Sequence, residues 1–303
     1  MKNIYFDNEH HEFTTSDLTI NQNNISNFLS VILQVTRKCN LKCQFCSESE
    51  IFEDPSLATL KSLLPKLKGV ERLYLSGGEP LLRDDIFEII DLYRPHFKVL
   101  GLPSNVTLID DEICKKLKGK INYLNAGLDG PREVNNLIRG GYDSIINGLK
   151  LLRIHNIEVS LSTVILNSTL PYLDYVVQIA DVLDIKKVKM VIPVSRGRAI
   201  AIPKEDFASE KDIIDKFNEI KKLKDKLSWN PRIKFTFWNE KTEGYAVLVY
   251  PNRKVYAWPV FNMENSVRYL GDLTKESIID IWNNYPYKQN HIRKYTGLSM
   301  NKC

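Results

Sequence analysis

Three of the five cysteines in the chain lie close together in the segment QVTRKCNLKCQFCSESE, which covers residues 34–50. Cys39, Cys43 and Cys46 have the spacing C-x3-C-x2-C, and Phe45 directly precedes the last of them. Three thiolates can bind three irons of a [4Fe–4S] cluster and leave the fourth iron open to a ligand from outside the protein. A structural zinc site normally has four protein ligands. The pattern therefore favours an iron–sulfur cluster over zinc.

The composition is that of an ordinary soluble protein, with 303 residues, 43% hydrophobic residues, 26% charged residues and a net charge of +5. The apolar runs are far shorter than the roughly 20 residues needed to cross a bilayer, and no secretion signal is visible. We expect a cytoplasmic, reducing compartment, where clustered cysteines bind metal more often than they form disulfides. The basic clusters indicate solvated helix faces, so we expect neither a membrane nor a nucleic acid as partner. His10 and His11 could complete a zinc site, but their spacing does not favour one.

The elements that must position these cysteines follow a regular alternation of short apolar runs and amphipathic segments. The predicted strands are Val31–Thr36, Arg72–Ser76, Lys98–Leu102, Tyr123–Leu128, Glu158–Val164 and Val188–Pro193. The predicted helices are Ser56–Leu67, Asp84–Tyr93, Asp110–Leu117, Asp143–Ile154, Leu170–Leu183 and Glu205–Leu227. This order predicts an α/β fold with a parallel sheet, a partial (β/α)6 TIM-like barrel. The cysteines follow the first strand, at the strand ends where such barrels gather their active sites.

The two ends of the chain differ from this alternation. Residues 1–28 are polar and predict a lead-in segment, and residues 29–228 form the partial barrel. Residues 229–303 predict a small α+β unit, in which AVLVYPNRKVYAW indicates a hairpin around a Pro-Asn turn. In the same unit, LGDLTKESIIDIWNN indicates a helix with an apolar stripe.

The cysteine pattern, with an aromatic residue before the last cysteine, resembles the signature of the radical S-adenosylmethionine (radical SAM) superfamily. The resemblance covers about residues 30–200. It implies that the open iron chelates the amino and carboxylate groups of the methionine part of SAM. It further implies that an electron from the cluster cleaves the sulfonium, giving a 5′-deoxyadenosyl radical that takes hydrogen from an organic substrate. A protein of the flavodoxin or ferredoxin type is the implied electron donor.

The second predicted strand ends in LSGGEP, which resembles the GGEP motif of that superfamily. Gly77 and Gly78 carry no side chain, so the backbone could closely approach the amino group of the cofactor. Glu79 offers a carboxylate to an ammonium-derived donor or buttresses the turn. By itself this is an ordinary tight turn, but its place after the second strand favours a role in binding the methionine end of SAM.

Four later strand ends also resemble motifs of the superfamily: PSNVTLI, GLDGP, LSTVILN and PVSRGRA. The first departs from the family's TNGTLL because Val106 stands where the family has glycine, and Arg139 with Gly140 resembles an RG pair that often follows the second. Each stretch could be an ordinary turn, but together they place polar residues at successive strand ends. The residues predicted to contact the cofactor are Ser104, Asn105, Asp129, Ser162 and, for the methionine carboxylate, Arg198.

The C-terminal unit resembles a SPASM or twitch domain that lacks its auxiliary clusters. Trp258 stands where the first auxiliary cysteine is expected, and Glu276 where the next is expected. Outside the signature, the chain has only Cys114, an expected core residue, and Cys303, a candidate hydrogen-atom donor. We therefore expect a single cluster, which favours redox-neutral, epimerising or eliminating chemistry over oxidation.

The substrate follows from the resemblance alone. Relatives with this C-terminal architecture commonly modify ribosomally made peptides, so a peptide is the first hypothesis. The alternative is a small metabolite, such as a nucleotide, sugar or amino-acid derivative, because the short N-terminal segment shows no peptide-recognition domain. A different class of protein, a non-catalytic iron–sulfur or SAM-binding protein, is disfavoured by the intact GGEP stretch.

Overall fold

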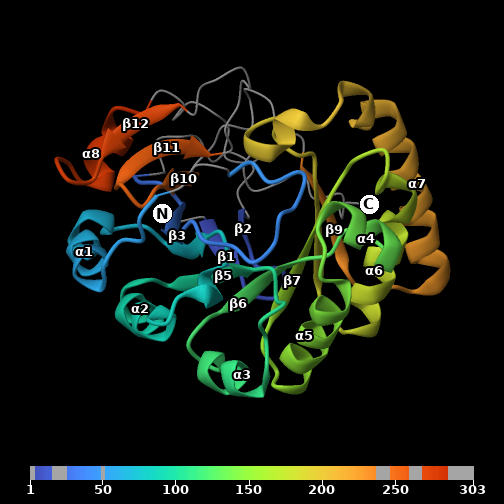
Figure 1. The fold of residues 1–303 in the computed structure, drawn as a ribbon, viewed down its shortest axis with the longest axis horizontal. Coiled ribbons are helices and arrows are strands. Elements are labelled where there is room, and N and C mark those ends of the chain that lie inside the picture. The colour runs from blue at the N-terminus through green and yellow to red at the C-terminus, as the bar shows by residue number, and fades with distance from the viewer. Residues whose placement is uncertain (1–3, 16–25, 49–51, 237–245, 259–267, 286–303) are drawn as a thin grey trace.

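The computed structural model describes residues 4–15, 26–48, 52–236, 246–258 and 268–285. Within these residues, ten strands form one sheet in the order β12-β11-β10-β3-β4-β5-β6-β7-β8-β9, and β1 and β2 form a separate pair. Figure 1 looks into a curved sheet with the helices on its outside. The two edge strands of this sheet, β12 and β9, are not paired with each other, so the barrel is open.

The six predicted strands are all present, and each pairs in parallel with the next. Their outward-facing residues, such as Leu73, Leu124 and Val188, are fully buried beneath the helices. This layering of helices over a parallel sheet confirms the predicted α/β partial barrel. The strands are β3 (Ser30–Thr36), β4 (Arg72–Gly77), β5 (Val99–Ser104), β6 (Tyr123–Gly127), β7 (Val159–Val164) and β8 (Lys187–Val191).

The predicted helices are also present; five of them begin one to five residues later than expected, and the helix predicted to begin at Asp143 begins one residue earlier, at Tyr142. Asp110, for example, precedes its helix because its carboxylate accepts a hydrogen bond from the backbone N–H of Ile113. The sequence did not predict α4 (Arg132–Ile138), a short helix that follows Pro131. The other helices are α1 (Leu57–Leu63), α2 (Ile86–Tyr93), α3 (Asp111–Leu117), α5 (Tyr142–Ile154), α6 (Leu173–Val182) and α7 (Glu210–Leu227).

The sheet extends past the six predicted strands at both edges. β9 (Arg232–Thr236) pairs in parallel with β8, and β10 (Ala246–Val249) pairs in parallel with β3. The predicted hairpin is formed by β10 and β11 (Lys254–Trp258), and β12 (Tyr269–Asp272) pairs antiparallel with β11. The division of the chain at residue 228 stays a prediction, and the same hydrogen-bonded sheet contains strands from both sides of it.

Helix α8 (Ile278–Asn283) follows β12 and begins with a capping box between Ser277 and Asp280. The apolar stripe predicted for this segment is buried. Trp282 and Tyr285 pack edge-on against Phe28, with ring centroids 5.0 and 4.9 Å from it. The last described segment of the chain is thus fastened beside the start of β3.

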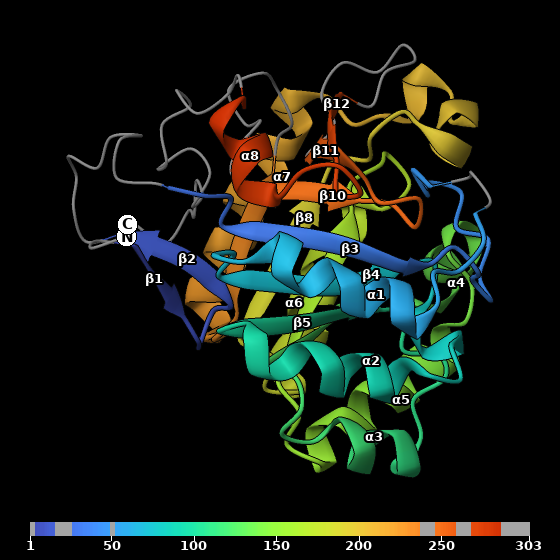
Figure 2. The same ribbon diagram turned by 90° about the vertical axis from the view of Figure 1, so that its left-hand side faces the viewer.

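The predicted lead-in segment contains a hairpin, β1 (Ile4–Asp7) and β2 (Glu12–Thr15). Figure 2 shows it at the end of the barrel where β3 begins, opposite the end where β3 leads into the cysteine segment. Phe6 and Phe13 of the hairpin are buried. The hairpin therefore closes the amino end of the barrel, and we call it the plug.

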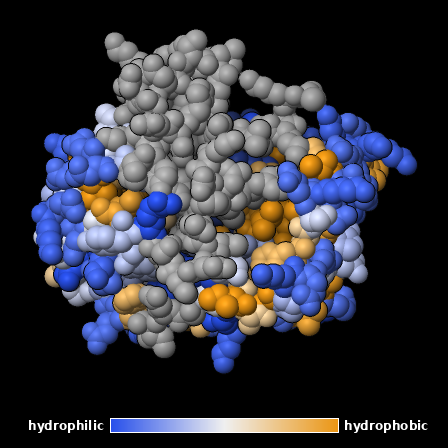
Figure 3. All heavy atoms as spheres, turned by 90° about the horizontal axis from the view of Figure 1, so that it is seen from above, coloured by the Kyte–Doolittle hydropathy of each residue, from blue (hydrophilic) through white to orange (hydrophobic). Residues whose placement is uncertain are grey.

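Seen from above, the flanks of the molecule are largely hydrophilic, with smaller hydrophobic areas between them (Figure 3). In the described part of the chain, no helix is both long and apolar enough to cross a membrane.

Candidate active site

The three clustered cysteines lie on the loop that follows β3, which we call the cysteine loop (residues 37–48). All three are free thiols; Cys39 is exposed, and Cys43 and Cys46 are half-buried. Burial raises the pKa of Cys43, and the charges of Cys46 and Cys39 raise it further, while Arg139 opposes them. The thiols are thus near enough to one another to interact.

The donor set of this loop fits a cluster better than a single ion. Among the described residues, no group of three or more His, Cys, Asp or Glu side chains converges as one metal ion would require. In an iron–sulfur cluster, by contrast, each thiolate binds a different iron. Three separate thiols on one loop, with Cys39 open to solvent, meet that second requirement.

The end of β4 supports the cysteine loop from below through two glycines. A Cβ on Gly77, whose φ is +151°, would lie 2.0 Å from the carbonyl oxygen of Thr36, and one on Gly78 would lie 2.1 Å from that of Lys38. The backbone N–H of Gly78 donates to Thr36, at 3.0 Å. The chain's own backbone therefore already requires glycine at both positions, and their predicted contact with the cofactor stays a prediction.

Glu79 joins the end of β4 to the end of β5. Its carboxylate accepts hydrogen bonds from the backbone N–H of Leu81 at 3.1 Å, the Ser104 hydroxyl at 2.9 Å and the backbone N–H of Asn105 at 2.6 Å. The side chain is completely buried, and burial raises its pKa against the effect of these hydrogen bonds. Of the two roles predicted for Glu79, these contacts match the buttress of the turn.

Asn105 lies beside the first cysteine. Its side-chain amide donates to Asn40 Oδ1 at 2.8 Å and lies 3.9 Å from the sulfur of Cys39. The next residue, Val106, has a φ of +58°. A β-branched residue rarely adopts this conformation, which explains why the family's motif has glycine there.

Asp129 accepts a hydrogen bond from Arg139, which contacts the cysteine loop. Its carboxylate is completely buried and accepts hydrogen bonds from Val164 N at 2.8 Å and Arg139 Nε at 2.6 Å. The Arg139 guanidinium in turn lies 5.0 Å from the centroid of the Phe45 ring. A Cβ on Gly127 would come within 2.4 Å of that guanidinium. Asp129 therefore positions Arg139 under the aromatic residue of the cysteine motif.

The loop after β8 holds the cysteine loop from a second direction. Arg198 donates its backbone N–H to Cys46 O and its Nε to Cys43 O, both at 2.9 Å. The neighbouring Gly197 has a φ of +61°, and a Cβ there would lie 2.6 Å from the carbonyl carbon of Ser47. The close approach of the two loops thus depends on glycine at this position.

A polar network, which the sequence did not predict, ties the cysteine loop to the hairpin. Glu48 accepts hydrogen bonds from Arg37 at 2.5 Å, Arg196 at 2.9 Å and the Tyr250 hydroxyl at 3.1 Å. Arg196 also bonds the Tyr250 hydroxyl. The signal available in the sequence was the charge on either side of the cysteines and in SRGR, which could have suggested ion pairs but not their partners.

The remaining predicted residues lie on other elements or outside the described residues. Ser162 is half-buried on β7, and Trp258 is half-buried at the end of β11. Glu276 accepts a hydrogen bond at 3.2 Å from a backbone N–H at the end of β12. Cys114 is buried in α3, as expected, and its burial raises the pKa of the thiol to about 11. Cys303 lies outside the described residues.

Known proteins resemble this chain in sequence and in fold. The family model of the radical SAM superfamily matches residues 33–179. An uncharacterized protein of Methanocaldococcus jannaschii is 30% identical over 48% of this chain and 55% of its own length. Fe-coproporphyrin III synthase of Methanosarcina barkeri is 35% identical over 43% of this chain and 35% of its own. The chain thus matches about half or less of these curated relatives.

A solved structure extends the likeness to most of the fold. Streptococcus suis SuiB, in a crystal structure bound to the precursor peptide SuiA, superposes with a TM-score of 0.74 over 88% of this chain and 67% of that one. The sequence identity is 15%, so the likeness concerns the fold alone.

Proposed function

The chain belongs to the radical SAM superfamily, and from this premise we propose that it is an enzyme that reductively cleaves SAM at one [4Fe–4S] cluster and takes hydrogen from an organic substrate. The observation that carries the proposal is the cysteine loop, where three free thiols are held between the glycine turn after β4 and the Arg198 loop after β8. When bound, the cluster supplies the electron that breaks a carbon–sulfur bond of SAM.

Each residue of the site has a proposed task. Cys39, Cys43 and Cys46 each bind one iron, and the fourth iron is left for SAM. The remaining residues form two groups, according to whether their carboxylates are completely buried against protein groups. The buried carboxylates of Glu79 and Asp129 accept hydrogen bonds from protein groups, so we assign them the positioning of their partners. The residues proposed to contact SAM itself are Gly77, Gly78, Ser104, Asn105, Ser162 and Arg198.

The proposals for the electron donor and the outcome of the reaction both start from a single cluster. Beyond the cysteine loop, the sequence holds only Cys114 and Cys303, which are too few for a second all-cysteine cluster. We propose that a flavodoxin- or ferredoxin-type protein reduces the single cluster. A redox-neutral, epimerising or eliminating reaction is favoured because it needs no second cluster to accept an electron.

The relatives support both substrate hypotheses. Fe-coproporphyrin III synthase is named for a small molecule, whereas SuiB binds a precursor peptide and shares the fold over most of this chain. A ribosomally made peptide is the first hypothesis, because the C-terminal unit resembles a SPASM or twitch domain, whose bearers commonly modify such peptides. A small metabolite is the second, because the sequence match is to the synthase.

The test is the formation of 5′-deoxyadenosine after anaerobic reconstitution with iron and sulfide, addition of SAM and reduction with dithionite. The wild-type protein should form it, and Cys43→Ala should lose both the brown chromophore and the product. Cys114→Ala is the matched control, because this buried thiol lies in α3 and should leave both unchanged. A fully loaded wild-type protein that forms no 5′-deoxyadenosine over hours would refute the proposal and indicate a non-catalytic SAM-binding protein.

A further inference from the structure

The interior face of the barrel carries polar side chains on β7, β8 and β9. Ser162 on β7, Lys189 on β8 and Lys234 on β9 point inward and are half-buried, whereas their outward-facing neighbours Leu161 and Met190 have no exposed surface. In a small barrel filled by its own side chains, the inward residues are packed as a core. Ser160 and Lys187, which face the same side two residues earlier on β7 and β8, are buried, so the inward face becomes more exposed toward the carboxyl ends of these strands, where a ligand could contact it.

The three inward residues lie side by side. Lys189 is the register partner of Ser162 on one neighbouring strand and of Lys234 on the other. Adjacent strands lie about 4.8 Å apart, and register partners project from the same face of a sheet. Two ammonium-bearing side chains and one hydroxyl therefore project from neighbouring positions on the same face of the sheet, so that one small oxyanion could contact more than one of them.

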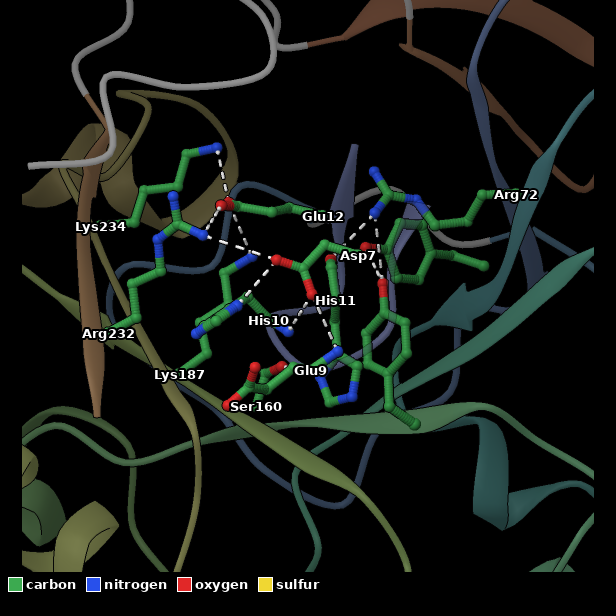
Figure 4. A network of polar contacts seen from close by, with 12 residues as sticks. Asp7, Glu9, His10, His11, Glu12, Arg72, Ser160, Lys187, Arg232 and Lys234 are labelled. Carbon is green, nitrogen blue, oxygen red and sulfur yellow. Dashed lines mark hydrogen bonds and ion pairs between the residues drawn. The ribbon is translucent and has the colours of Figure 1, made fainter. Parts of the chain in front are cut away.

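A second layer of charge forms the floor beneath them, next to the plug. Glu12 of the plug pairs with Lys187 at 3.2 Å, Arg232 at 2.8 Å and Lys234 at 3.6 Å (Figure 4). Arg72 of β4 adds a further cation, donating to Ser30 Oγ at 3.0 Å. The carboxylate of Glu12 thus pairs with the floor cations Lys187 and Arg232, and its longer contact with Lys234 joins this floor to the layer above it.

The lowered pKa values of Lys189 and Lys234 agree with this geometry. Burial lowers the pKa of Lys189 to about 7, and the positive charges of Lys234 and Arg72 contribute to the decrease. The pKa of Lys234 is also lowered, first by burial, although Glu12 opposes the change. An anion placed between the two lysines would favour their protonated forms, because an opposite charge nearby stabilises the charged state.

We propose that Lys189 and Lys234 form an anion-binding subsite inside the barrel, beside Ser162, and that the subsite takes a carboxylate or phosphate group of the substrate. The subsite deepens the proposed function and rests on it for the identity of the ligand as a substrate. Lys189 lies two residues before the end of β8, and the loop that follows carries Arg198 to the cysteine loop. A substrate anchored there by its anionic group extends from the plug toward the cysteine loop.

The test is a titration of the full, reconstituted chain with sodium phosphate and, separately, sodium acetate, followed by calorimetry. SAM is present throughout, and sodium chloride keeps the ionic strength constant. The wild-type protein should bind at least one of the two anions saturably, and the stronger of the two identifies the group. Lys189→Gln should weaken binding about tenfold or more, equivalent to about 1.4 kcal/mol. Lys189→Arg, which keeps the charge, should restore most of it.

The matched control is Lys186→Gln, which removes the same charge at the surface, where Lys186 pairs with Asp184. This variant should bind like the wild type. Equal affinities for wild type and Lys189→Gln, or no saturable binding of either anion, would overturn the subsite. Formation of 5′-deoxyadenosine by the wild-type protein is measured in parallel, so a failure of the proposed function is recorded separately from a failure of anion binding.

Discussion

Gly197→Ala should separate the cysteine loop from the loop after β8, which holds it in place. A Cβ at this position would lie 2.6 Å from Ser47 C and 2.7 Å from Cys46 O, distances too short for either atom to remain in place. The left-handed backbone, with φ +61°, costs alanine roughly 1–2 kcal/mol. Losing the hydrogen bond from Arg198 N to Cys46 O costs about 1 kcal/mol more. We expect the free energy of unfolding to fall by about 2–3 kcal/mol in total.

Gly119→Ala provides the control for this substitution. Gly119 also has a positive φ, +76°, but a Cβ there meets no atom within 4 Å. It should therefore lose only the roughly 1–2 kcal/mol of backbone strain. Urea unfolding of the apoprotein measures the stability, and iron per chain after reconstitution measures the loop. Iron content should fall in Gly197→Ala alone. If Gly197→Ala had the iron content of the wild type and were no less stable than Gly119→Ala, the cysteine loop would not depend on its contact with the loop after β8.

Three further predictions concern other parts of the fold. The Lys189 pKa of about 7 lies below its unfolded value, so the unfolded chain binds more protons above pH 7 and the penalty for burying the charge shrinks as the pH rises. Lys189→Met should therefore stabilise the protein most at pH 6 and progressively less toward pH 10; a difference independent of pH would contradict this reasoning. Ser277→Ala removes the cap that also pairs with Asp280 and should cost about 1 kcal/mol in urea unfolding, whereas an unchanged midpoint would mean that α8 does not need its cap. Tyr250→Phe keeps the ring but loses the hydroxyl that bonds Glu48, so a loss of about 1–2 kcal/mol is expected, and wild-type stability would show that this network contributes little.

The regular part of the fold could be predicted because its signal is local. Continuous apolar strands and amphipathic helices have different periods, and these periods gave six strands and six helices. β9 was missed because RIKFT alternates charged and apolar residues, a pattern typical of a surface segment, whereas its charged side chains Arg232 and Lys234 pair with Glu12 of the plug. The pairing of β10 with β3 was also unpredictable, since no local pattern specifies which edge a distant strand joins.

In the candidate site too, local motifs could be predicted from the sequence and long-range contacts could not. The cysteines were predicted from one short motif, the paired glycines and Glu79 from a second, and the residue types at a later strand end directed attention to Asp129. Their partners were not predicted, because the choice of partner depends on which groups are buried together. The network around Glu48 is the clearest case, since Tyr250 is 202 residues away in sequence.

The central claim is that the cysteine loop holds a cluster with one iron open to SAM. Electron–nuclear double resonance on the dithionite-reduced protein, with SAM labelled by ¹⁵N at its amino group, tests this claim directly. Our account predicts a hyperfine coupling between the nitrogen and the cluster in the wild type, retained in Cys114→Ala. A reduced cluster that shows no nitrogen coupling at saturating SAM would contradict it.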